Sequence, residues 1–142
     1  MATRFWEATA GRTFVGRLAS GSDLVDEIER FAAEMGITAA EVTAVGAMRR
    51  VRYAFRNQPG RRYQELTSTT HLEMTSFVGN LSLNEDRPFL HAHASFADAK
   101  GATVGGHLVR GCQVFVGEVV IREFSDVSLV RTHDEETGLA LW

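Results

Sequence analysis

Three of the five histidines lie close together in the chain, as His91, His93 and His107. Neutral imidazole is the commonest nitrogen ligand of zinc and related divalent ions, and three imidazoles leave one coordination position open for water or a substrate atom. His91 and His93 are two residues apart in an alternating run, so in a strand their side chains share one face. The spacing points to a metal site, while hydrogen-bonded, half-buried histidines are the simpler alternative.

The third histidine joins the first two only if the chain turns back in one register. Residues 98–101 read as a tight turn with Gly101 in the left-handed position. A three-residue loop sets His93 opposite His107 and makes His91 a diagonal neighbour, about 7–8 Å away. A two- or four-residue loop would instead put His107 on the other face, so the inference depends on this register.

Two glutamates are candidates for acid–base roles beside such an ion. Glu73 stands in a strand-like segment, where it could orient a metal-bound histidine or act as a general base. Glu118 lies inside an apolar run and needs a partner if it is buried. A solvated glutamate on the surface of a strand is the simpler interpretation.

A basic, aromatic segment is the best candidate for contacting phosphate groups. Six of the fifteen Lys and Arg residues fall there, interleaved with Tyr and Phe: Arg49, Arg50, Arg52, Arg56, Arg61 and Arg62. An edge hairpin that carries arginines for solubility is the alternative. The net charge of −3 and the pI near 5.9 argue against a domain that binds nucleic acid through a strongly basic surface.

Composition is that of one globular domain. The chain has 142 residues, of which 44% are hydrophobic and 23% charged, and we expect a single domain over 1–142 with a core of about 12–132, a short N-terminal arm and a C-terminal tail. No run approaches the roughly 20 apolar residues of a membrane span, and the N-terminus lacks an apolar signal core, so a cytoplasmic protein is expected. The single cysteine, Cys112, excludes an internal disulfide and is expected to be a buried, inert thiol.

Periodicity predicts an α+β fold, mainly an antiparallel twisted sheet with one principal amphipathic helix packed on it. The helix is expected after Gly21, with Ser22 as its N-cap and Gly36 at its end. The strand-like segments are 12–19, 42–48 with a bulge or close contact at Gly46, 49–56, 61–67, 69–83 with a turn or a bulge at Gly79, 89–97, 102–108, 113–123 and 127–132.

Several motifs together resemble the plants-and-prokaryotes-conserved (PPC) domain family. They are PFLHAHASFAD at 88–98, Gly101, VGGHL at 104–108, GCQV at 111–114, EVVI at 118–121 and HLEMTSFVG at 71–79. The resemblance covers about 13–132 and implies a compact α/β domain that forms a homotrimer. It also implies that His91, His93 and His107 match the positions that hold a metal, usually zinc, in prokaryotic members. Plant members pair this domain with AT-hook segments that bind the minor groove of AT-rich DNA, but the hook core Arg-Gly-Arg-Pro is absent here.

Two functions follow from these observations. The first is a metal-bearing trimer that acts as a regulatory or scaffold module and binds DNA or a partner protein. The alternative is a small metal-dependent enzyme, a hydrolase or lyase, in which Glu73 or Glu118 moves a proton at the open metal position. A zinc ion with a purely structural role is a third reading, although structural sites usually fill all four positions with protein ligands.

Overall fold

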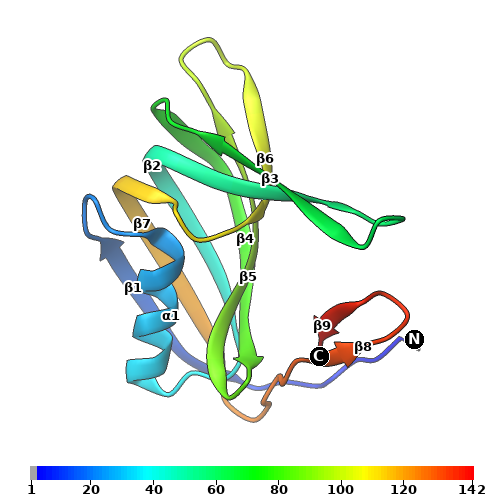
Figure 1. Cartoon of the computed structure of the whole chain (residues 1–142). Helices are drawn as coiled ribbons and strands as arrows, with labels where there is room; N and C mark the ends of the chain where they lie inside the picture. Colours follow the sequence, from blue (N-terminus) through cyan, green and yellow to red (C-terminus); the bar gives the residue numbers. More distant parts are fainter. Residues whose placement is uncertain (1–2) are drawn as a thin grey trace.

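The computed structural model describes residues 3–142 as a strongly twisted antiparallel sheet with a helix over one of its faces (Figure 1). The sheet has seven strands in the order β1-β7-β2-β4-β5-β6, with β3 paired to β2, and a separate β8–β9 hairpin follows near the C-terminus. The elements are β1 (Ala10–Leu18), α1 (Leu24–Met35), β2 (Ala40–Asn57), β3 (Arg62–Ser68), β4 (Leu72–Asn84), β5 (Arg87–Ala97), β6 (Thr103–Leu108), β7 (Gln113–Phe124), β8 (Thr132–Asp134) and β9 (Leu139–Leu141).

The predicted α+β class is wrong, because the protein is mostly antiparallel β. Strands make up 60% of the structure and helix only 9%. The segments predicted at 42–48 and 49–56 join into the single 18-residue strand β2, and the segment at 69–83 becomes the 13-residue strand β4. Alternation of polar and apolar residues dominates this chain, and helical spacing occurs in a single 12-residue stretch.

Two details of the predicted strands also differ. β4 runs without a turn through Gly79, and its register break lies between Met74 and Ser76, where an extra residue is accommodated against β5. Residues 127–132 do not form the predicted strand. An isolated bridge joins Val130 to Leu83, and Thr132 already belongs to β8 of the β8–β9 hairpin.

The ends of α1 are fixed by side-chain and backbone caps. Asp23, and not Ser22, is the N-cap, and its carboxylate accepts from the N–H groups of Val25 and Asp26 at 3.0 and 3.1 Å. Gly36 closes the helix in the left-handed conformation, as predicted. The buried face of the helix packs on the sheet through Leu24, Val25, Ile28 and Ala32.

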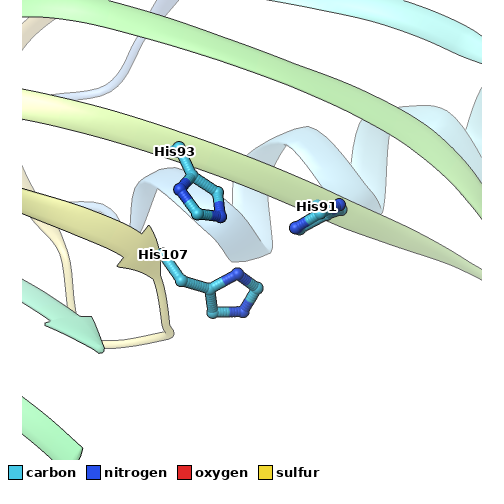
Figure 2. Close-up of side chains that lie close together, drawn as sticks. All are labelled: His91, His93 and His107. Carbon is cyan, nitrogen blue, oxygen red and sulfur yellow. The ribbon is translucent and has the colours of Figure 1, made fainter. Parts of the chain in front are cut away.

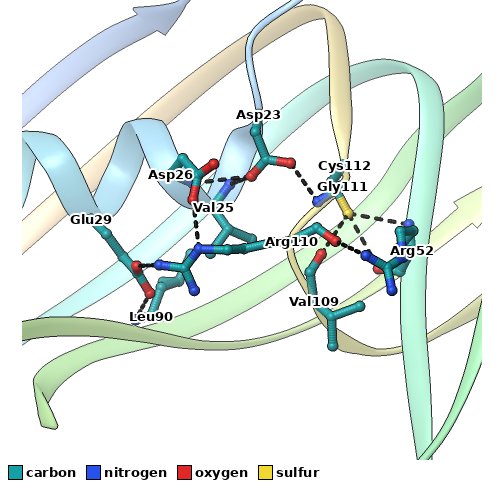
Figure 3. Close-up of polar contacts among 10 residues, drawn as sticks. All are labelled: Asp23, Val25, Asp26, Glu29, Arg52, Leu90, Val109, Arg110, Gly111 and Cys112. Atoms are coloured by element: carbon teal, nitrogen blue, oxygen red, sulfur yellow. Dashed lines mark hydrogen bonds and ion pairs between the residues drawn. The ribbon is translucent and has the colours of Figure 1, made fainter.

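A polar network links α1 to the strands that carry the histidines (Figure 3). Arg110, just after β6, pairs with Asp26 at 2.6 Å and also with Glu29. Glu29, only 8% exposed, accepts from the Leu90 N–H at 2.9 Å. Leu90 precedes His91 on β5, so one carboxylate joins the beginning of β5 to the end of β6.

The segment after β6 is also anchored in the core. Cys112 is fully buried, and its thiol donates to the carbonyls of Arg52 and Val109. The expected burial of this thiol is confirmed, and burial raises the pKa of Cys112 to about 11. No helix among the described residues is long and apolar enough to cross a membrane.

Candidate metal centre

The turn between β5 and β6 sets the geometry of the three histidines. The Asp98 N–H donates to the Ala102 carbonyl at 3.0 Å, and Gly101 adopts φ of 80° and donates to the Asp98 carbonyl at 2.9 Å. His93 therefore pairs directly with His107, which confirms the predicted three-residue loop and its register.

Close packing of the two strands depends on a residue without a side chain. A Cβ atom added at Gly105 would lie 2.2 Å from the Ala94 carbonyl oxygen, far closer than any allowed contact. Gly105 is two residues before His107, so the approach of β6 to β5 and the position of the third ring depend on it.

The three imidazole rings converge on one point (Figure 2). Their centroids are 5.4 Å apart for His91 and His93, 5.1 Å for His91 and His107, and 5.4 Å for His93 and His107. One ring nitrogen from each residue lies within 4.8 Å of the others. His91 and His107 are half-buried and His93 is exposed.

The surroundings favour the neutral form of His91 and His107, which is the form that binds a metal. Burial, with the nearby charges of His107, Arg131 and His93, lowers the pKa of His91 to about 4. Burial likewise lowers the pKa of His107, with contributions from His93 and Arg131. Nδ1 of His107 is buried without a hydrogen-bond partner within the described chain.

These residues fit a tetrahedral divalent ion. Zinc–nitrogen bonds of about 2.0–2.1 Å place two imidazole nitrogens about 3.4 Å apart. The three observed nitrogens lie within 4.8 Å of one another, and rotation of the side chains would bring them to that distance. A buried nitrogen without a partner is costly, and coordination to an ion would satisfy it.

Neither candidate glutamate is brought to the histidines. Glu73 pairs with Ala97, four residues along β5 from His93 and so about 13 Å away. Glu118 is on β7, which β2 and β4 separate from β5. Both side chains are exposed, and within one chain neither reaches the open side of the three rings.

The structure places other side chains beside the rings. Asn80 is directly opposite His91 on β4, the Tyr63 ring lies 5.2 Å from that of His107, and the charge of Arg131 acts on both His91 and His107. Asn80 is not among the residues predicted from the sequence. A two-residue turn at Glu85 and Asp86, both with positive φ, would have indicated it, because counting back from that turn pairs residue 80 with residue 91.

A cavity of about 270 Å³ adjoins His107. It opens where β5 has no strand partner on the β6 side, because β6 pairs with β5 only from His93 onward. Charged and aromatic side chains line it, including Glu29, Arg52, Glu65, Phe89 and Arg110.

The six candidate arginines do not form one free basic surface. Arg56 and Arg61 donate to backbone carbonyls at 135–138 and so hold the turn of the β8–β9 hairpin. Arg52 pairs with Glu65, and the guanidinium of Arg49 lies 5.3 Å over the Phe115 ring. The guanidinium groups of Arg50 and Arg62 make no hydrogen bond or ion pair within residues 3–142.

Comparison with known proteins identifies the family. Residues 6–125 match the Plants and Prokaryotes Conserved (PCC) domain. A metal-containing protein from Archaeoglobus fulgidus is 36% identical, with 99% of both chains covered and a TM-score of 0.94. A plant- and prokaryote-conserved (PPC) protein from Pyrococcus horikoshii is 30% identical, with coverage of 99% and 96% and a TM-score of 0.92.

Two further likenesses are narrower. A candidate DNA-binding protein from Bacteroides thetaiotaomicron shares the fold at 22% identity, with 94% and 95% of the chains covered and a TM-score of 0.84. The bifunctional protein GlmU of Synechococcus sp. strain JA-3-3Ab is 31% identical over 89% of this chain, which spans only 20% of that protein's length. The family match over residues 6–125 agrees with the similarity to the Archaeoglobus and Pyrococcus structures. The chain therefore belongs to the Plants and Prokaryotes Conserved domain family.

Proposed function

We propose that this protein binds one divalent metal ion, most simply zinc, through His91, His93 and His107 and presents the open coordination position to a small-molecule ligand. The observation that carries the proposal is the pairing of His93 with His107, which brings three imidazoles from adjacent strands to one point. The Archaeoglobus relative, described as metal-containing, supports it. When bound, such an ion supplies Lewis acidity and a water of lowered pKa.

Metal analysis of the purified protein tests this proposal. We expect one equivalent of ion per chain in the wild type and in His133→Gln, whose ring lies outside the cluster. His91→Gln and His107→Gln should lose it, because two imidazoles alone bind weakly. Retention of a full equivalent in both cluster variants, or no ion in any sample after zinc addition, would exclude the site.

An open position favours ligand chemistry over a structural ion. No cysteine, carboxylate or further histidine among residues 3–142 is grouped with the three rings to fill a fourth position, whereas structural zinc sites usually have four protein ligands. The open position would also allow a hydrolase or lyase reaction at the metal. Glu65 lines the adjoining cavity and is therefore a better candidate for proton transfer than Glu73 or Glu118. Glu65→Gln should abolish zinc-dependent turnover of a substrate while metal content is kept.

We also propose that the chain forms a homotrimer through the sheet face opposite α1. One residue from each of six paired strands forms a row across that face, and the exposed members include Val15 at 81% and Val78 at 61%. Half of the row is valine, and exposed apolar side chains gathered on one face mark interaction surfaces. The row is Val15, Val120, Thr43, Val78, His93 and His107.

Sedimentation equilibrium tests the trimer. Val15→Glu should shift the wild-type trimer toward the monomer, whereas Met35→Glu, at the end of α1 and away from the row, should not. A wild-type monomer at all concentrations would contradict this part of the proposal.

DNA binding is the second candidate function. Proteins with this fold include a candidate DNA-binding protein, and Arg50 and Arg62 have unpaired guanidinium groups within the described chain. Titration of a labelled duplex should show affinity that falls steeply with salt and is lost in a variant carrying Arg50→Ala with Arg62→Ala. Arg122→Ala, whose guanidinium pairs with Glu41, is the control, and no binding at low salt would exclude this candidate.

A further inference from the structure

Arg131 is a half-buried cation without a counter-ion at the edge of the histidine cluster. Its Nε donates to Ser82 Oγ at 2.8 Å, Nη1 to the Ala140 carbonyl at 2.9 Å and Nη2 to Asn80 Oδ1 at 3.3 Å. The guanidinium lies 4.9 Å over the Phe89 ring. All these partners are neutral, and none of the ion pairs within residues 3–142 involves Arg131. The side chain is thus held in place while its charge stays uncompensated.

Strand pairing places this charge beside the rings. Asn80 is opposite His91, and Ser82 is opposite Phe89, so all four side chains share the sheet face that carries the histidines. Directly opposed side chains are about 5 Å apart, and the guanidinium that contacts Asn80 therefore adjoins the His91 ring.

A bound anion would compensate the positive charge of Arg131. A divalent ion on three neutral imidazoles keeps its full charge, and Arg131 adds a second centre of positive charge to the same partly buried place. Burying a charge is costly unless it is paired. The fixed contacts use three of the five guanidinium N–H groups, which leaves two for a bound oxyanion.

We propose that Arg131 binds the carboxylate of a small organic acid whose neighbouring hydroxyl or carbonyl oxygen occupies the open metal position. This inference rests on the proposed metal-binding function and names its ligand class. The planar guanidinium matches a carboxylate in shape. The Arg131 guanidinium lies over the Phe89 ring, and Phe89 also lines the cavity of about 270 Å³ beside His107, although Arg131 itself does not line that cavity.

Cobalt-substituted protein provides the test, because ligand binding at the metal changes its visible absorption. Wild-type protein is titrated with glycolate, with acetate, which lacks the second oxygen, and with inorganic phosphate. We expect glycolate to bind at least tenfold more tightly than acetate or phosphate. Tighter binding of phosphate would overturn the carboxylate assignment, and equal binding of acetate would overturn the two-point contact.

Variants separate Arg131 from the metal site. Arg131→Gln should keep one cobalt per chain, with unchanged or tighter metal affinity because a neighbouring positive charge is gone, and should bind glycolate at least tenfold more weakly. Arg122→Gln should behave as the wild type. Unchanged glycolate affinity in a cobalt-loaded Arg131→Gln refutes the inference and leaves the metal site intact, whereas failure of the wild type to bind cobalt refutes the proposed function itself.

A second variant guards against loss of folding in Arg131→Gln. Arg131→Lys keeps the charge but loses the planar fork. It should load cobalt and bind glycolate more weakly than the wild type, and glycolate affinity equal to that of the wild type would also refute the inference.

Discussion

Acidification of the metal-free protein should destabilise the fold through His91. In the unfolded chain this ring takes up a proton near its ordinary pKa of about 6.5, but in the folded protein only near about 4. Between these two pH values the unfolded state holds more protons, so the free energy of unfolding falls as pH falls. Above about 6.5 the contribution of His91 is fully present, and below about 4 no further loss is expected from this residue.

The size of the effect follows from the burial of the ring. Each pKa unit corresponds to about 1.4 kcal/mol, so a fully buried ring with this shift would contribute ~3 kcal/mol. His91 is half-buried, and solvent screening reduces the expected loss to about 1.5 kcal/mol. His93, His107 and Arg131 face the same ring, and each raises the cost of a proton on His91 when it is charged.

Urea unfolding of metal-free protein at several pH values from 7 to 4 measures this contribution. The difference in unfolding free energy between wild type and His91→Gln should shrink by about 1.5 kcal/mol over that range. His133→Gln, at an exposed ring next to Glu135, should not reproduce the change. A wild-type minus His91→Gln difference that is constant with pH would refute the reasoning.

Three further predictions concern the framework of the site. Gly105→Ala places a methyl group against the Ala94 carbonyl and should lower the free energy of unfolding by about 2–4 kcal/mol. It should also weaken zinc binding in a competition titration, and a zinc affinity equal to that of the wild type would contradict this. Glu29→Ala leaves the Leu90 N–H unpaired and removes one of the two carboxylates that pair with Arg110. It should lower the free energy of unfolding, measured in urea, by about 2 kcal/mol, and an unchanged free energy would count against that role. Cys112 should not react with a thiol reagent until urea unfolds the chain, because its pKa is about 11, and rapid reaction in buffer would contradict its burial.

The sequence predicts the histidine cluster because its geometry is local. One turn closed by Gly101 sets the β5–β6 register, and alternation then decides the face on which each ring lies. The same reasoning, applied to the two-residue turn at Glu85 and Asp86, reaches Asn80.

Arg131 and the arginine contacts could not be predicted in this way. Arg131 sits outside the sheet strands, just before β8, so no register places it over Asn80 and Ser82. Arg56 and Arg61 looked like free basic residues because their partners are backbone carbonyls about 75 to 80 residues later, at 135–138. Contacts across such sequence distances follow from tertiary packing, and local periodicity carries no information about them.

X-ray absorption at the zinc edge of the wild-type protein tests the central claim most directly. The three-histidine site predicts three imidazole nitrogens at about 2.0–2.1 Å and one oxygen from solvent or ligand, with the imidazole contribution reduced in His107→Gln. A shell with fewer than three imidazoles in the wild type, a sulfur ligand, or a spectrum that His107→Gln leaves unchanged would contradict it.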